Sequence, residues 1–304
     1  MSKRQEEGKE IAQDYGKEQP KIRMDVSPTV EGKELGGRDR YVADTFLNET
    51  GCRILMKLAS TSAVEGDGYT EHRSPHTKYE RFEGVTIGRL ALMVYFGQLE
   101  PAGLELLLDS TEAVRDHVER YFKLDRQLYF TYSHLVCRTA IPDSPMDRDD
   151  LSHEIHADNC IIEENDCVRE SPAYVWRDYS AILYLNDDFE GGEFFFAKAA
   201  KNRDPQATVS PLCGRMVGFS AGSENLHGVR AVRKGRRCAL ALWFTLDETH
   251  AEFERTLARM ILERVRLMGP INRTDLFIPL KYDEVLATVF EDDEILKTLL
   301  ENDW

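Results

Sequence analysis

Two residues of types that commonly bind divalent metals lie two positions apart within the stretch 153–160, whose sequence is His-Glu-Ile-His-Ala-Asp-Asn-Cys. They are His156 and Asp158, and a single His227 follows a short polar loop much further along the chain. Two imidazoles and one carboxylate are the ligand set of non-haem Fe(II) oxygenases, and they leave other positions on the ion open. The spacing therefore predicts an iron site made of these three residues, with His153 outside it.

A histidine two positions before an acidic residue is weak evidence by itself. With eight histidines and 54 acidic residues in the chain, about one such pair is expected by chance. The sequence contains three, and the other two begin at His117 and His250. Residues two apart share a face on a strand but point to nearly opposite sides of a helix. Because His117 and His250 lie in segments with helical character, the geometry favours His156 and Asp158.

A predicted hairpin after His227 adds Arg237 to the candidate site. The run 227–232 is separated from 236–246 by Arg-Lys-Gly, and three-residue hairpin loops favour Gly in their last, left-handed position. That loop would pair Ala231 with Arg237 and would put His227 and Arg237 on one interior face, about 13 Å apart at ~3.3 Å per residue. This separation suits an arginine side chain plus a five-carbon diacid that chelates the metal. A guanidinium can hold the far carboxylate of such a diacid with two parallel hydrogen bonds.

Simpler interpretations of the same residues stay open at this point. His227 alone is most often a surface or capping residue, and Arg237 could belong to an exposed basic turn. A zinc site using His153, His156, Asp158, Cys160 or Cys167 is the rival metal site. Closed zinc sites normally take four ligands at regular spacings, and no such spacing occurs in the sequence, which favours iron. Cys160 and Cys167 could equally form a disulfide or remain two buried thiols.

Composition limits the classes of protein to consider. The chain has 304 residues and a net charge of −15, which argues against a general nucleic-acid or anionic-membrane surface. No run approaches the ~18 apolar residues that a membrane span needs. Residues 1–20 lack an apolar signal region, the end Glu-Asn-Asp-Trp is no sorting signal, and the six cysteines form no CxxC pair. The compartment and the oligomeric state therefore stay open on the residues alone.

The pattern of elements divides the chain into four parts. Residues 1–38 are polar and predict a disordered lead-in. Residues 39–125 form a helical support region, with a loop over 65–84 and helical periodicity at 54–59, 86–98 and 102–124. Residues 126–250 predict an all-β sandwich or barrel, with strands at 128–141, 173–185, 193–197, 207–212, 215–220, 227–232 and 236–246. Residues 251–304 predict a C-terminal helical cap.

Several stretches of the β-rich part resemble the prolyl 3-hydroxylases of the leprecan type. They include His-Ala-Asp-Asn-Cys at 156–160, Arg-Asp-Tyr-Ser-Ala-Ile-Leu-Tyr-Leu-Asn at 177–186, and Arg-Cys-Ala-Leu-Ala-Leu-Trp-Phe-Thr-Leu-Asp at 237–247. The resemblance extends over roughly residues 38–260 and is most specific in the β-rich part. It implies an α+β fold with a double-stranded β-helix (jelly-roll) core, supporting N-terminal helices and a C-terminal helical segment.

The resemblance also implies a reaction and a set of cofactors. These are Fe(II), 2-oxoglutarate, O2 and L-ascorbate (vitamin C), used to hydroxylate C3 of proline in collagen-like chains. His156, Asp158 and His227 match the iron ligands of the family, and Arg237 matches the residue that holds the distal 2-oxoglutarate carboxylate. Tyr184 is a candidate hydroxyl donor to the same carboxylate, although a core strand tyrosine is equally expected there, and Thr139 is a further candidate.

The departures from the family leave two further questions open. Its members usually carry an N-terminal helical-repeat region, a signal peptide and a retention tail, so this chain is expected to be a catalytic portion, a fragment or a divergent intracellular homologue. The lumen of the endoplasmic reticulum is the compartment that the resemblance implies, and the cytoplasm is the alternative. The rival functions are the same chemistry on a non-collagen protein or a small molecule, and a non-catalytic scaffold.

Overall fold

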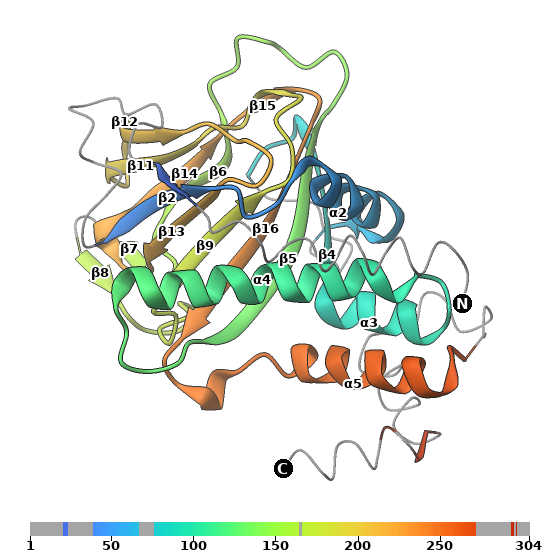
Figure 1. The fold of residues 1–304 in the computed structure, drawn as a ribbon. Coiled ribbons are helices and arrows are strands. Elements are labelled where there is room, and N and C mark those ends of the chain that lie inside the picture. Colours follow the sequence, from blue (N-terminus) through green and yellow to red (C-terminus); the bar gives the residue numbers. More distant parts are fainter. Residues whose placement is uncertain are drawn as a thin grey trace.

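Two main antiparallel sheets, two short two-stranded ribbons and a layer of helices make up the computed structural model (Figure 1). The structure describes residues 21–23, 39–66, 76–163, 166–271, 293, 294 and 296. The larger sheet has the strand order β1 (Lys21–Arg23), β2 (Arg40–Asp44), β13 (Met216–Ser220), β9 (Tyr179–Tyr184), β16 (Arg236–Thr245), β5 (Tyr129–Ala140), β4 (Glu80–Thr86) and β3 (Val64–Glu65). The smaller sheet has the order β12 (Asn202–Val209), β11 (Phe194–Ala199), β14 (His227–Arg230) and β6 (Leu151–His156).

From β5 onward the chain moves back and forth between the two sheets. β5, β9, β13 and β16 lie in the larger sheet, and β6, β11 with β12, and β14 alternate with them in the smaller one. This winding makes the two sheets face each other, as in a jelly roll. The predicted double-stranded β-helix core in an α+β fold is therefore confirmed.

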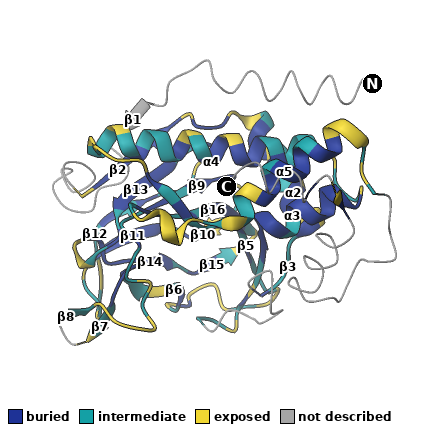
Figure 2. Cartoon of the chain, turned by 90° about the horizontal axis from the view of Figure 1, so that it is seen from below, coloured by how far each residue is buried: buried dark blue, intermediate teal, exposed yellow. Residues whose placement is uncertain are grey.

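Helices cover the face of the larger sheet that points away from the smaller sheet (Figure 2). They are α2 (Glu49–Ser62), α3 (Ile87–Tyr95), α4 (Pro101–Phe122) and α5 (Phe253–Met268). The side chains of Asn48 and Thr86 accept hydrogen bonds from the first turns of α2 and α3, which satisfies backbone donors that a helix leaves unpaired. The helical periodicity predicted from the sequence matches these helices. None of the described helices is both long and apolar enough for a membrane span.

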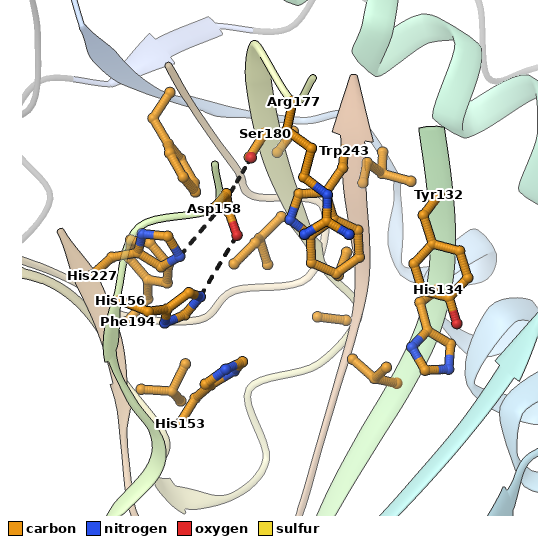
Figure 3. Close-up of a pocket in the computed structure, with 18 of the residues that line it drawn as sticks. Tyr132, His134, His153, His156, Asp158, Arg177, Ser180, Phe194, His227 and Trp243 are labelled. Atoms are coloured by element: carbon orange, nitrogen blue, oxygen red, sulfur yellow. Dashed lines mark hydrogen bonds and ion pairs between the residues drawn. The ribbon is translucent and has the colours of Figure 1, made fainter. Parts of the chain in front are cut away.

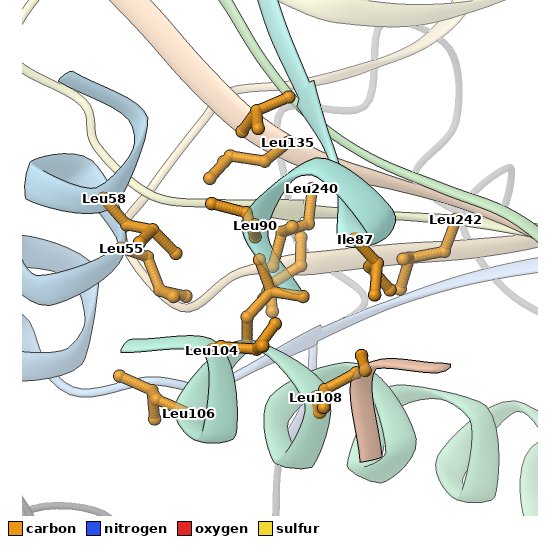
Figure 4. Packing of buried hydrophobic residues seen from close by; sticks show 14 of the residues in the cluster. Leu55, Leu58, Ile87, Leu90, Leu104, Leu106, Leu108, Leu135, Leu240 and Leu242 are labelled. Atoms are coloured by element: carbon orange, nitrogen blue, oxygen red, sulfur yellow. The ribbon is translucent and has the colours of Figure 1, made fainter. Parts of the chain in front are cut away.

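Two apolar layers hold the sheets and helices together. Leucines of β5 and β16 pack on α2, α3 and α4 in the outer layer (Figure 4), which includes Leu55, Leu90, Leu104, Leu135, Leu240 and Leu242. The space between the sheets holds the second layer, with Val42, Tyr184, Phe194, Phe196, Val217, Phe219 and Ala239. Alternate residues of β16 enter the two layers, as the period of two in a strand requires.

Strands were missed where charged residues are buried. The loop predicted at 65–84 contains the start of β4, whose Glu80 is buried, and β2 carries the buried Arg40. Charged residues predict a loop when only the sequence is known. Their burial in a strand requires hydrogen-bond or ionic partners, and those partners are distant in the chain. The strand predicted from residue 173 begins at Tyr179, and the one predicted from 207 begins at Asn202. Most of 1–38 and of 272–304 lies outside the described residues.

The hairpin predicted after His227 is wrong. β14 pairs with β6 and β11 in the smaller sheet, β15 (Val232–Lys234) pairs with β10 (Glu190–Gly191), and β16 pairs with β5 and β9 in the larger sheet. Gly235 does take the predicted left-handed conformation, with φ 84°. The turn at Gly235 therefore belongs to a crossing between facing sheets, and Arg237 lies opposite Arg138 of β5 instead of Ala231.

Three disulfides use all six cysteines. Cys52 is bonded to Cys213, Cys137 to Cys238, and Cys160 to Cys167. The last of these confirms one of the two states that the sequence left open. The first two join positions 161 and 101 residues apart, so in the chain-entropy account they restrict the unfolded chain more than the short loop does.

Candidate metal centre

The register of β6 and β14 brings the two predicted histidine ligands together. His156 at the end of β6 lies directly opposite His227 at the start of β14, and directly opposed residues of an antiparallel pair point to the same side. Asp158 follows just after β6, where its backbone N–H donates to the carbonyl of Ala221 at 3.0 Å. The acid is thus held at the strand end by a hydrogen bond to the loop before β14.

The three side chains converge on one point between the sheets (Figure 3). Nε2 of His156 lies 3.6 Å from one oxygen of Asp158, and Nε2 of His227 lies 3.8 Å from the other. One ligand atom of each residue lies within 4.8 Å of the others, and no other group of three or more His, Cys, Asp or Glu does so in the described part of the chain. Three ligands on one side of an ion would leave its other side open to the cavity.

Hydrogen bonds on the far side of each ring orient the histidines. Nδ1 of His156 donates to the carbonyl of Glu154 and Nδ1 of His227 donates to that of Asn225, both at 2.8 Å. Placing the proton on Nδ1 leaves the lone pair of each Nε2 for an ion, which is the usual arrangement around metal-binding histidine. Ser180 donates to Oδ2 of Asp158 at 2.6 Å and fixes the carboxylate in the same way.

The electrostatics of the group suit a cation. Burial lowers the pKa of His227 to about 4, so its ring is neutral at neutral pH. Burial alone would raise the pKa of Asp158, but the two histidines hold that pKa well below its usual range. Burial lowers the pKa of His156, and its contact with Asp158 outweighs this and leaves the pKa raised. A neutral imidazole beside an ionised carboxylate is the protonation state that binds metal.

Removing the Ser180 hydroxyl should weaken metal binding without removing a ligand. We expect Ser180→Ala to lower Fe(II) affinity by about tenfold to a hundredfold, the usual effect of an outer hydrogen-bond partner. Anaerobic metal titration measures this, with Ser60→Ala on the outer helix α2 as the matched control. Equal affinities for wild type and Ser180→Ala would show that the hydroxyl does not hold the carboxylate.

A cavity of about 650 Å³ opens from the metal group between the two sheets. Its polar lining includes Arg138, Arg177 and Arg237, and its aromatic lining includes Phe82, Tyr132, Tyr174, Trp176 and Trp243. Arg177 lies over the rings of Tyr174 and Trp243, at 4.0 and 4.4 Å from their centroids. The cavity is thus cationic and aromatic beside a three-ligand metal group.

Arg237 lies in this cavity with unused hydrogen-bonding capacity. Its Nε donates to the carbonyl of Gly192 at 2.9 Å, while Nη2 is buried and has no hydrogen-bond partner among the described residues. The guanidinium lies 5.2 Å from the ring centroid of Tyr184, whose buried hydroxyl also has no partner there. Two buried donors without acceptors are costly, and a carboxylate would satisfy both.

Comparison with known proteins supports this view of the cavity. Residues 147–245 match the 2OG-Fe(II) oxygenase superfamily, an interval that holds the whole metal group and Arg237. This part of the chain belongs to that superfamily. Fe(II), 2-oxoglutarate and O2 are the cofactors of its members, and the donors of the cavity fit the first two.

Three relatives extend the similarity beyond that interval. Prolyl 3-hydroxylase 1 of Gallus gallus is 50% identical over 242 residues, covering 79% of this chain and 33% of the relative. Prolyl 3-hydroxylase 2 of Gallus gallus is 47% identical over 245 residues, covering 80% and 35%. Prolyl 3-hydroxylase 2 of Homo sapiens is 46% identical over 245 residues, covering 80% and 34%. The chain spans about a third of the length of these relatives.

Not every candidate for 2-oxoglutarate binding lies in the oxygenase cavity. Tyr184 is on the inner face of β9 and packs against Arg237, as the resemblance implied. Thr139 lies opposite Arg236 on the other face of the sheet, whereas Arg138 and Arg237 face the cavity. Thr139 therefore lies outside the cavity lining, because alternate residues of β5 point to opposite sides.

Some residues of the oxygenase site were not expected from the sequence. Arg138 and Arg177 line the cavity, and Ser180 binds the metal-group carboxylate. His153, which the predicted ligand set leaves out, lines the cavity and stacks on His156 with 4.3 Å between ring centroids. Arg138 could have been predicted from the alternation of inward and outward residues along β5. Nothing in the local sequence predicts that Ser180 contacts the metal group.

Proposed function

We propose that the chain is an Fe(II)/2-oxoglutarate-dependent dioxygenase that hydroxylates peptidyl proline, at C3 in collagen-like chains. The observation that carries the proposal is the convergence of His156, Asp158 and His227 in one cavity with the unsatisfied donor of Arg237. Together they provide for a metal ion and a dicarboxylate. An intact set of this kind argues against a non-catalytic scaffold.

The cofactors supply the oxidation and the protein supplies binding and orientation. Bound Fe(II) would supply dioxygen activation, in which the decarboxylation of 2-oxoglutarate to succinate and the hydroxylation of the substrate C–H bond would each contribute two electrons and take up one oxygen atom. His156, Asp158 and His227 hold the ion, and Ser180 keeps the carboxylate in place. Arg237 orients the co-substrate through its distal carboxylate. We propose ascorbate as the reductant that keeps the iron ferrous.

The aromatic wall of the cavity supports a proline-containing peptide as substrate. Tyr132 stacks on Trp243 with 5.7 Å between ring centroids, and Arg177 lies between Trp243 and Tyr174. Aromatic-lined grooves bind the extended polyproline II conformation, which is rigid before binding and therefore loses little entropy. The relatives named prolyl 3-hydroxylase support the same substrate class and the C3 position.

The disulfides support an oxidising compartment as the location of the reaction. Disulfides persist in oxidising compartments and are rare in the cytosol, and all six cysteines of this chain are paired. We propose the lumen of the endoplasmic reticulum in preference to the cytoplasm. Collagen-like chains as the protein partner agree with that location.

Product analysis with peptides tests the substrate. We expect a collagen-like Gly-X-Y peptide, incubated with the protein, Fe(II), 2-oxoglutarate and ascorbate, to gain one oxygen atom on proline, and fragmentation or NMR to place it on C3. The control is a peptide of the same composition in which proline lies outside Gly-X-Y repeats. Oxygen on C4, or equal hydroxylation of the control peptide, would contradict the C3 collagen assignment. Consumption of 2-oxoglutarate without any peptide product would favour a small-molecule substrate.

A further inference from the structure

Two aromatic rings form a corner at the outer end of the cavity. Strand β16 lines the cavity from Arg237 at the inner end to Trp243 at the outer end. The rings of Tyr174 and Trp176 also line it, and they meet edge to face with 5.6 Å between centroids. Tyr174 is 51% exposed. Tyrosine and tryptophan with one side packed and the other side wet are typical of binding surfaces.

The segment 169–178, which carries this corner, is joined to both sides of the cavity. The side chain of Asn159, which directly follows the metal group in the chain, donates to the carbonyl of Arg177 at 3.0 Å. The backbone N–H of Asp178 donates to the carbonyl of Phe244 in β16 at 2.8 Å. The corner is therefore held between the metal group and the outer end of β16.

A second ring contact fixes the orientation of Trp176. Its ring stacks on the ring of His250, with 4.5 Å between centroids and 9° between planes. His250 belongs to η3 (Glu248–His250), the short helix that follows β16. Because this stack is formed within the protein alone, Trp176 needs little further ordering when a ligand binds. A side chain that is ordered in advance costs less entropy on binding.

The spacing of the rings suits a polyproline II strand. The Arg177 guanidinium contacts both Trp243 (Figure 3) and Tyr174, at 4.4 and 4.0 Å from their ring centroids. These two rings therefore lie no further apart than the two contacts placed end to end. In polyproline II, with three residues per turn and a rise of ~3.1 Å, side chains three positions apart share one face at about 9 Å. In a Gly-X-Y chain, three positions are one triplet.

We propose that Tyr174 and Trp176 form an outer subsite, which binds the imino acid one triplet away from the proline that is hydroxylated. The inference rests on the proposed function, since it takes a collagen-like chain as the substrate. The apolar pyrrolidine ring would pack into the corner between the two aromatic rings, as in the aromatic grooves that bind proline-rich segments. Tyr174 and Trp176 are then specificity-determining residues, and His250 is a positioning residue for Trp176.

The test is the KM for three Gly-X-Y peptides that share one target proline, measured from the hydroxylated product. The first peptide has proline one triplet before and one triplet after the target, and in each of the other two one of these prolines is alanine. For the wild type, alanine on one side should raise the KM by about twofold to tenfold, the range for one lost ring contact. In Tyr174→Ala the three peptides should have equal KM values, with the KM for 2-oxoglutarate unchanged.

Three further variants make the test specific. His250→Phe keeps a ring against Trp176 and should retain the preference for proline, whereas His250→Ala should lose part of it. Leu212→Ala is the matched control, because it removes another exposed apolar side chain that lies outside the cavity lining, and it should retain the full preference.

The outcomes separate the outer subsite from the proposed function. Equal KM values for the three peptides in the wild type would overturn the subsite and leave the proposed function in place, because rings that only close the cavity do not distinguish proline from alanine. A Tyr174→Ala protein that kept the preference for proline would also overturn the subsite. A wild-type protein that hydroxylated none of the peptides would overturn the proposed function together with the inference.

Discussion

Asp158→Ala is expected to abolish turnover of 2-oxoglutarate and to lower Fe(II) affinity by more than about a hundredfold. Removal of an outer hydrogen-bond partner alone costs up to about that factor, and this substitution removes a charged ligand. The remaining ligands would be two neutral imidazoles that lie close together, His156 and His227. No other described acid lines the cavity to replace the lost carboxylate. Anaerobic iron titration and succinate formation measure the two effects.

Two further variants make the result specific. Asp158→Asn keeps the size of the side chain but loses the charge, so it should bind iron almost as poorly as Asp158→Ala. Asp187→Ala removes an exposed acid outside the cavity and should leave both measurements unchanged. An Asp158→Ala protein that retained turnover would refute the assignment of the ligands. Circular dichroism confirms that each variant is folded.

Glu80→Ala should cause the largest loss of stability of any single substitution considered for this chain. Its carboxylate links β4 to Arg148, Ser152 and the backbone of Val232, so it joins both sheets and the loop between them. Removing it leaves the buried Arg148 guanidinium without that counter-charge, although Asp150 remains at 2.9 Å. Breaking a buried pair in this way costs about 3–5 kcal/mol. Denaturant unfolding measures the change in free energy.

The same strand supplies the control for this prediction. Glu83 forms an ion pair with Arg236 at 3.1 Å, and both side chains are about a quarter exposed to solvent. Pairs that water can screen contribute about 0–1 kcal/mol, so Glu83→Ala should change stability little. Similar losses for Glu80→Ala and Glu83→Ala would show that the buried network does not hold the two sheets together.

The metal group could be predicted because two of its three residues are close in the sequence. Its geometry requires only that these two residues lie at the end of a strand. His156 and Asp158 are two residues apart at the end of a strand, and the strand opposite delivers His227 in register. The placement of Arg237 in the same cavity was reached through a pairing that is wrong. A left-handed glycine after a short polar turn is compatible with a hairpin and with a crossing between sheets, and only the tertiary fold distinguishes them.

The features that the sequence did not predict depend on distant partners. β4 was taken for a loop because its Glu80 is buried only through the partners Arg148 and Ser152. Thr139 and Arg138 are neighbours, and choosing between them required the phase of β5 relative to the cavity. The local sequence does not indicate which alternate residues of β5 face the cavity, because both faces of the strand are covered. Helices cover one face and the smaller sheet covers the other.

We propose that this chain couples the oxidation of 2-oxoglutarate to the hydroxylation of a peptide. The most direct measurement is mass spectrometry of both products after reaction under isotopically labelled dioxygen. We expect one labelled oxygen atom in succinate and one in the proline of a collagen-like peptide, in equal amounts, with both lost in Asp158→Ala. Unlabelled products, or labelled peptide formed equally well without 2-oxoglutarate, would contradict the account.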